Sequence, residues 1–290
     1  METMRLGRTG LTVTRSAFGA LPIQRLSVAE AAELLQKARE QGINFYDTAR
    51  GYSDSEEKLG VAFAGSEGVI IASKTPATDY DGAMRDLETS LAKLKRDRID
   101  IYQLHNPSAL PDPGDRRSAL YALREAQRAG AIGHIGITNH SHRLAIAAAE
   151  SGLYETVQFP LSCLSDEGDL AVVDACARQD IAVIAMKALA GGLLGSARLS
   201  FAFLRQFANV VPIWGFQRES ELMEVVALEA NPPALTEGLL KQIAKERREL
   251  AGQFCRGCGY CMPCPANIPI NMAARMALLL RRAPWENFVT

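Results

Sequence analysis

The sequence predicts an α/β protein built as a (β/α)8 barrel. Eight short β-rich runs alternate with longer segments of helical period. Several runs are apolar at nearly every position, among them VIIASK, IDIYQL and IAVIAM, as is typical of parallel strands buried on both faces. Eight strand–helix units within ~230 residues is the count of such a barrel.

The expected strands are spread over the first three quarters of the chain: Ser16–Ala20, Ile43–Thr48, Val69–Thr75, Ile99–His105, Ile132–Thr138, Thr156–Ser162, Ala182–Leu189 and Asn209–Gly215. A doubly wound open sheet is the alternative. For a dinucleotide it would usually carry a G-x-G-x-x-G motif after the first strand, and the sequence has no such motif.

The helices between the strands carry clear end signals. Ser27–Gln41 opens on a capping-box pattern, with Ser27 three residues before Glu30, and stops at Gly42. Tyr80–Lys95 is amphipathic, with apolar residues on one face and charges opposite. Arg116–Ala129 is followed by Gly130 in the same way as the first helix.

The two ends of the chain are expected to lie outside the barrel proper. Met4–Thr14 alternates around Thr9-Gly10 and predicts a hairpin that plugs the N-terminal mouth. After about Ala230 the pattern changes at Asn231-Pro232-Pro233. The sequence therefore predicts a barrel over 1–230 and a small helical appendage over 231–290, with helices at Thr236–Leu250 and Asn271–Arg282.

Composition narrows the class of partner. The 290 residues include 32 basic and 33 acidic side chains, a net charge of −1. This balance argues against binding of nucleic acid or an anionic membrane through bulk charge, and favours a small-molecule partner. Neither a signal-peptide pattern nor an apolar run of ~20 residues is evident, so a cytoplasmic protein is expected.

Polar residues recur where the predicted strands end. Asp47, Lys74, His105, Asn139 and Gln158 stand at or just after successive strand ends, and Tyr52 lies in the loop after Asp47. Each alone could be a cap, a solvated charge or a core residue. Because the active sites of barrels lie at the C-terminal ends of the strands, their recurrence predicts one shared pocket.

The segments around these residues carry a family resemblance. GINFYDTARGYSDSEEKLG, ASK at Lys74, IDIYQLH at His105, GITNH and VQF at Gln158 occur in this order. Together they are similar to the aldo-keto reductases, over roughly Met4 to Val226. The resemblance implies an NAD(P)H-dependent reduction of an aldehyde or ketone, or the reverse, with Asp47, Tyr52, Lys74 and His105 as catalytic residues.

The chemistry of these four side chains suits such a reaction. Carbonyl reduction needs a proton donor, and a tyrosine with a pKa of about 10 is a weak acid. A neighbouring ammonium favours the phenolate, so Lys74 is expected to lower the pKa of Tyr52. Asp47 would hold Lys74, and His105 would donate a hydrogen bond that orients the substrate.

The resemblance also implies a nicotinamide cofactor across the barrel mouth, NADP with NAD as the alternative. Thr138, Asn139 and Gln158 match positions that hold its carboxamide. Gly191, Gly192 and Leu193 follow the seventh strand, where small residues let backbone N–H groups approach a pyrophosphate. An ordinary turn is the alternative there.

The loop after the eighth strand completes the expected cofactor site with Gly215, Phe216, Gln217 and Arg218. Arg218 is the candidate for the 2′-phosphate of NADP, with a solvated arginine as the alternative, and Glu224 matches an adenine-contacting position. The chain departs from the family pattern at Met186, where many relatives have an aromatic residue, and at Glu221, where a basic residue is common.

Four of the six cysteines form one run, C-x2-C-x2-C-x2-C-P, made of Cys255, Cys258, Cys261 and Cys264. This spacing is one residue shorter than the bacterial ferredoxin run and favours a [4Fe–4S] cluster; structural zinc, which usually needs a longer segment between pairs, is the alternative. The tail is similar to that of an iron–sulfur branch of the family.

A direct electron path from such a cluster to the substrate is hard to justify, because a nicotinamide transfers a hydride and a cluster one electron. A structural or redox-sensing role is expected instead. Two other functions stay open: an electron-transfer or redox-sensing protein, with a redox partner, whose barrel mainly binds cofactor, and a regulatory barrel without catalysis.

Overall fold

Eight parallel strands close into a barrel in a computed structural model that describes residues 1–250 and 264–282. The order around the barrel is β10-β3-β4-β5-β6-β7-β8-β9, and β10 pairs with β3 to close it. The strands are β3 (Ala17–Gly19), β4 (Phe45–Asp47), β5 (Ile70–Thr75), β6 (Ile99–His105), β7 (Ile132–Thr138), β8 (Thr156–Pro160), β9 (Ala182–Met186) and β10 (Val210–Gly215). The predicted (β/α)8 barrel is confirmed, and the open sheet is excluded.

The strand bounds follow the apolar runs closely. β6 and β7 have the predicted bounds, and six strands are shorter than expected. β4 and β9 are each three residues shorter than expected, and β9 ends at Met186 instead of Leu189. Lys187 and Ala190 have φ of 57° and 53°, a left-handed conformation that turns the chain out of the sheet.

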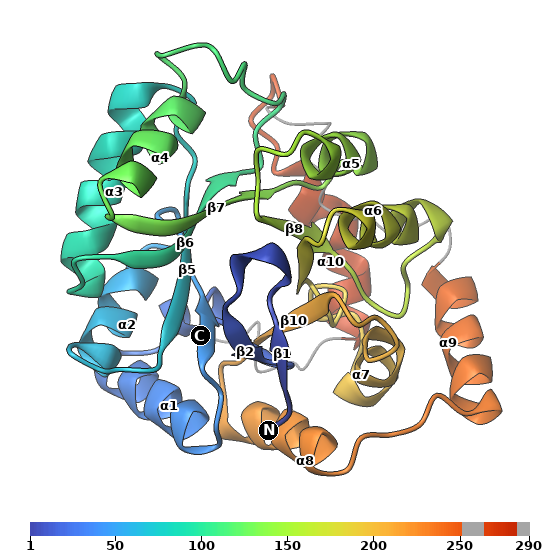
Figure 1. Cartoon of the computed structure of the whole chain (residues 1–290). Helices are drawn as coiled ribbons and strands as arrows, with labels where there is room; N and C mark the ends of the chain where they lie inside the picture. Colours follow the sequence, from blue (N-terminus) through green and yellow to red (C-terminus); the bar gives the residue numbers. More distant parts are fainter. Residues whose placement is uncertain (251–263, 283–290) are drawn as a thin grey trace.

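Eight helices surround the strands (Figure 1). They are α1 (Val28–Glu40), α2 (Ser55–Phe63), α3 (Tyr80–Leu94), α4 (Ala119–Arg128), α5 (His142–Glu150), α6 (Glu167–Arg178), α7 (Ala197–Leu204) and α8 (Glu219–Ala230). The predicted capping box of Ser27 and Glu30 is present at α1. α4 begins later than expected because the Ser118 side chain caps it, accepting from Tyr121 N.

The N-terminal hairpin, β1 (Thr3–Arg5) and β2 (Thr12–Thr14), lies across one end of the barrel (Figure 1). Leu6 and Val13 are fully buried in one cluster with inward-facing strand residues such as Ile184. Gly7 has φ of 51°, and a Cβ there would lie 2.6 Å from the nitrogen of Ala182, the first residue of β9. The hairpin therefore closes the N-terminal mouth, as predicted.

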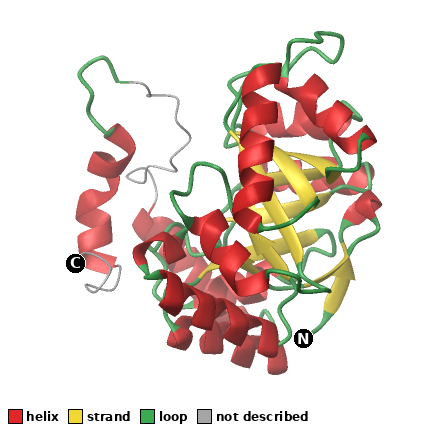
Figure 2. Cartoon of the chain, turned by 90° about the vertical axis from the view of Figure 1, so that its left-hand side faces the viewer, coloured by secondary structure: helices red, strands yellow, loops and turns green. Residues whose placement is uncertain are grey.

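The C-terminal helices are α9 (Glu237–Leu250) and α10 (Ile270–Arg282). Figures 1 and 2 place α10 at the opposite end of the barrel from the hairpin. Arg275 of α10 donates to the carbonyls of Ala190 (2.9 Å) and Gly191 (3.0 Å), and Arg282 pairs with Glu246 of α9 at 2.5 Å. α10 is thereby attached to the loop after β9. No helix among residues 1–250 and 264–282 is long and apolar enough to span a bilayer.

The barrel interior changes character along its axis. Alternate residues of a strand share a face, so Ile101, Gln103 and His105 of β6 all face inward. Ile101 belongs to the apolar cluster beneath the hairpin, whereas Gln103 and His105 lie toward the C-terminal mouth. The apolar half of the interior stabilises the barrel, and the polar half, at the C-terminal mouth, holds the candidate site residues.

Candidate active site

A buried ion pair occupies the centre of the C-terminal mouth. Nζ of Lys74, in β5, lies 2.7 Å from Oδ2 of Asp47, in β4. It also donates a hydrogen bond to the Thr48 carbonyl at 2.5 Å. Both side chains are at most 2% exposed. Burial raises the pKa of the Asp47 carboxyl, while the Lys74 ammonium acts in the opposite direction. Each charge compensates the desolvation of the other.

Two glutamine amides complete the surroundings of Asp47. Gln103 Nε2 lies 3.4 Å from Asp47 Oδ1, Gln158 Nε2 lies 3.4 Å from Asp47 Oδ2, and Gln103 donates to Gln158 Oε1 at 2.9 Å. Gly136 of β7 leaves room for this network, because a Cβ there would lie 2.9 Å from Gln103 Cγ. Gln103 was not among the predicted site residues, although it lies two residues before His105 on the same face of β6.

Tyr52 stands beside the ion pair, in the loop between β4 and α2. Lys74 Nζ lies 4.9 Å from the centre of its ring. Burial raises the pKa of the phenol, and the Lys74 ammonium opposes that rise. The expected influence of Lys74 is present, but the net direction is opposite to the prediction, because desolvation of the phenolate outweighs the nearby cation.

His105 packs against Tyr52 from the end of β6. The two rings meet edge to face, with centroids 5.8 Å apart and planes at 82°. Burial lowers the pKa of His105 to about 3, and the charges of Lys74 and His140 add to the effect. The imidazole is therefore neutral at physiological pH, with one nitrogen as a hydrogen-bond donor.

Buried charges on α2 fix the loop that carries Tyr52. Glu56, which is fully buried, pairs with Arg50 and accepts from Ser73 Oγ at 2.6 Å. Lys58, 1% exposed, donates to Asp54 (2.8 Å) and to the carbonyl of Ile23 (3.1 Å) in the short helix η2 (Pro22–Arg25). The sequence prediction missed this framework, whose only signal was the charged run SDSEEK after Tyr52.

The predicted carboxamide-binding residues stand in one row with His105. His105 pairs in register with Thr138, and Thr138 with Gln158. Thr138 Oγ1 accepts from Asn106 N at 3.0 Å, and Asn139 Nδ2 donates to the Pro107 carbonyl at 2.9 Å. These side chains tie the loop after β6 to the rim of β7.

The loop after β9 is compact. Gly191 and Gly192 have φ of 68° and 92°. The N–H groups of Gly192 and Leu193 donate to the Leu189 carbonyl at 3.0 and 3.1 Å, so in this conformation they close the turn itself. Met186, the last residue of β9, packs on the apolar cluster inside the barrel.

The loop after β10 places its predicted residues in different surroundings. Gly215 is exposed at the rim, whereas Phe216 is buried against Phe18, with ring centroids 5.1 Å apart. Gln217 accepts from Arg25 at 3.0 Å, and Arg218 pairs with Glu221. Glu224 Oε1 accepts from Ala197 N at 3.0 Å and so caps α7.

Of the four clustered cysteines, Cys255, Cys258 and Cys261 lie outside the described residues. Cys264 is partly exposed and forms no disulfide with any of the described residues. Cys163 and Cys176, the two scattered cysteines, are free and fully buried in the core.

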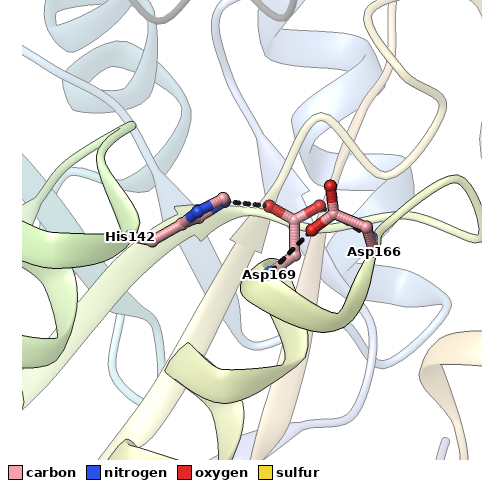
Figure 3. Close-up of side chains that lie close together, drawn as sticks. All are labelled: His142, Asp166 and Asp169. Carbon is pink, nitrogen blue, oxygen red and sulfur yellow. Dashed lines mark hydrogen bonds and ion pairs between the residues drawn. The ribbon is translucent and has the colours of Figure 1, made fainter.

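A histidine–aspartate cluster on the outer side of the rim was not predicted (Figure 3). His142 of α5 and Asp166 and Asp169 at the start of α6 bring ligand-type atoms within 4.8 Å of one another. His142 Nε2 lies 2.7 Å from Asp169 Oδ1, and the two aspartates form the capping box of α6. These hydrogen bonds explain why the three side chains lie together: they join α5 to α6 and cap the start of α6.

Tyr52, Lys74, Asp47 and His105 thus lie together at the C-terminal mouth of a (β/α)8 barrel. A family model described as the Aldo/keto reductase family matches residues 16–202. The chain belongs to this family.

Relatives agree with the assignment. The chain is 31% identical over 235 residues to the uncharacterized oxidoreductase YrpG of Bacillus subtilis, covering 69% of this chain and 70% of that protein. It is 32% identical over 156 residues to a 6-dehydroglucose reductase of Novosphingobium aromaticivorans, covering 47% and 50%. The solved structure of the thermostable aldo-keto reductase Tm1743 with the inhibitor epalrestat superposes with a TM-score of 0.70 at 25% identity, covering 85% of this chain and 100% of that one. The prediction of an aldo-keto reductase is confirmed.

Proposed function

We propose that this protein reduces the carbonyl group of an aldehyde or ketone to an alcohol, or catalyses the reverse, with a nicotinamide cofactor. The observation that carries the proposal is the contact of Tyr52 with both Lys74 and His105, at 4.9 Å and 5.8 Å from the ring centre. A phenol, a buried ammonium and a neutral imidazole are thereby gathered at one point of the barrel mouth.

Each residue has a distinct part in the reduction. Tyr52 gives its proton to the carbonyl oxygen as the alcohol forms, and the Lys74 ammonium stabilises the resulting phenolate. Asp47 holds Lys74 at 2.7 Å. His105, neutral because of its lowered pKa, donates a hydrogen bond to the carbonyl oxygen and orients it toward Tyr52.

The residues of the mouth fit a dinucleotide. Thr138 stands beside His105 and Gln158 beside Thr138, and the amides of Gln158 and of Asn139, the next residue after Thr138, suit a carboxamide. The loops after β9 and β10 are those where barrels bind phosphate. When bound, the nicotinamide supplies the hydride. The choice between NADP and NAD depends on the loop after β10.

The substrate class is a small carbonyl compound. The relative described as a 6-dehydroglucose reductase supports including oxidised sugars beside simple aldehydes and ketones. The mouth, with its neutral imidazole and buried amides, suits an uncharged polar substrate.

The C-terminal segment, residues 231–290, contains the four clustered cysteines. We propose that Cys255, Cys258, Cys261 and Cys264 bind one [4Fe–4S] cluster with a structural or redox-sensing role, which requires the reducing environment of the cytoplasm. The proposal is supported by the cysteine spacing alone. Iron and sulfide analysis after anaerobic purification, with absorbance at about 400 nm, tests it; stoichiometric zinc in place of iron would overturn it.

The catalytic proposal is tested by oxidation of NADH and NADPH with a panel of aldehydes, ketones and oxidised sugars, comparing the wild type with Tyr52→Phe. We expect turnover by the wild type and a loss of about 100-fold or more in kcat in the variant, with nucleotide affinity unchanged. Turnover that survives Tyr52→Phe would exclude Tyr52 as the acid. Tight nucleotide binding without any turnover would instead favour a sensing or regulatory barrel.

A further inference from the structure

A carboxylate occupies the loop that follows β10. Glu221, in the first turn of α8, accepts the backbone N–H groups of Gln217 (2.8 Å) and Arg218 (3.0 Å) through Oε2. Its other oxygen pairs with the Arg218 guanidinium. The side chains of Arg218 and Glu221 are 33% and 30% exposed, so the ion pair is accessible to a ligand at the rim.

This loop belongs to the same rim as the catalytic residues. Gly215, the last residue of β10, pairs in register with Gly19 of β3, and Gly19 pairs with Asp47 of β4. In α/β barrels a phosphate commonly binds to the loops after the last two strands and to a helix N-terminus there. In this chain, two N–H groups ahead of α8 and the cation of Arg218 already bind the carboxylate of Glu221.

Two further acidic residues of α8 lie near the loop in sequence, each with a partner of its own. Glu219 pairs with Lys37 at 2.6 Å, and Glu224 caps α7. A phosphate brought to Arg218 would meet the Glu221 carboxylate as a like charge and would compete for the same donors. A ribose hydroxyl, in contrast, can donate a hydrogen bond to a glutamate, which is how acidic side chains recognise the 2′-hydroxyl of NAD.

We infer that the β10–α8 loop selects NAD(H) over NADP(H), with Glu221 as the residue that excludes the 2′-phosphate. The inference rests on the proposed function, since it concerns the cofactor of that site. It reverses the preference that Arg218 alone suggests, because the charge of Arg218 is balanced within three residues.

Binding of NADH and NADPH, measured by calorimetry without a carbonyl substrate, tests the inference. We expect the wild type to bind NADH at least tenfold more tightly than NADPH. Glu221→Gln keeps an oxygen for the two N–H groups but removes the charge, and we expect it to raise the affinity for NADPH about tenfold with little change for NADH. Adding Arg218→Gln to this variant should abolish the gain.

The matched control is Glu219→Gln, which removes a carboxylate from the same turn of α8 and should leave the ratio of the two affinities unchanged. A wild type that prefers NADPH overturns the inference, as does an equal shift in Glu221→Gln and Glu219→Gln. A protein that binds neither nucleotide contradicts the proposed function as well, which separates the two failures.

Discussion

The ammonium of Lys74 lies 4.9 Å from the centre of the Tyr52 ring, although the two residues come from different strand–helix units. Lys74 belongs to β5, and Tyr52 to the loop that follows β4. The same ammonium lies 2.7 Å from Asp47. One buried cation therefore joins the ion pair that holds the mouth together to the phenol that we propose as the acid.

Replacing Lys74 separates these two effects. In Lys74→Met the Asp47 carboxylate is left buried without a cation, so the free energy of unfolding should fall by about 3–5 kcal/mol. Turnover should fall by about 100-fold or more. Urea unfolding and steady-state kinetics measure the two losses.

The double variant Asp47→Asn/Lys74→Met is the control. It removes both buried charges and should recover most of the stability while remaining inactive. A double variant as unstable as the single one, or one with restored turnover, would contradict the assigned roles.

His105 should make the protein sensitive to mild acid. Its pKa is lowered to about 3 in the folded chain, whereas the pKa of a histidine in an unfolded chain is about 6.5. Below about pH 6.5 the unfolded state therefore binds a proton that the native state does not. The free energy of unfolding should decrease as the pH is lowered from about 6.5 to about 3.

The variant His105→Gln should lose less free energy of unfolding than the wild type between about pH 7 and 4.5. Denaturant unfolding at several pH values measures how the free energy of unfolding of each protein changes with pH. The difference between the two proteins at about pH 8 is the reference. Parallel curves for the two proteins would show that His105 is not the group responsible.

The loop after β9 should not tolerate a side chain at Gly191. Its φ is 68°, and a Cβ would lie 2.3 Å from Nη2 of Arg275. Gly191→Ala should cost about 1–2 kcal/mol in backbone strain and detach α10, seen as faster hydrogen exchange along that helix.

Gly195→Ala is the control in the same loop, because a Cβ there meets nothing within 4 Å and its φ is not in the left-handed region. Adding Arg275→Ala to Gly191→Ala should relieve the clash but not the strain. Equal exchange in Gly191→Ala and Gly195→Ala would refute the contact between α10 and the loop.

Glu56 should act on catalysis through the position of Tyr52. It is buried and binds both Arg50, in the loop that carries Tyr52, and Ser73, in β5. Glu56→Gln should lower kcat by about 10- to 100-fold with little change in nucleotide affinity, because the proton donor is displaced. The exposed Glu57→Gln, one residue away, should match the wild type; an equal effect in both variants would point to a general change in α2.

Much of the fold could be predicted because local periodicity encodes burial. β6 and β7 were predicted to the residue, since their apolar residues continue to Leu104 and Ile137, one position before each strand ends. Asp47, Lys74 and His105 were found together because strand ends meet at one mouth. β9 was predicted too long because no local signal marks the left-handed turn at Lys187.

The surroundings of the site were harder to predict, since they depend on side-chain partners distant in the sequence. Gln103 bonds to Gln158 across the barrel, and Glu56 reaches Ser73 on another strand. The pKa of Tyr52 could not be read from Lys74 alone, because its direction depends on how deeply the phenol is buried.

Transfer of deuterium is the measurement that tests the central proposal most directly. NADH and NADPH carrying deuterium at both C4 positions would be incubated with the protein and a carbonyl substrate from the panel, and the alcohol examined by mass spectrometry and NMR. We predict one deuterium on the former carbonyl carbon. We also predict that Tyr52→Phe lowers the rate of its transfer by about 100-fold or more. An alcohol without deuterium at that carbon, or one formed equally fast by the variant, would contradict the proposal.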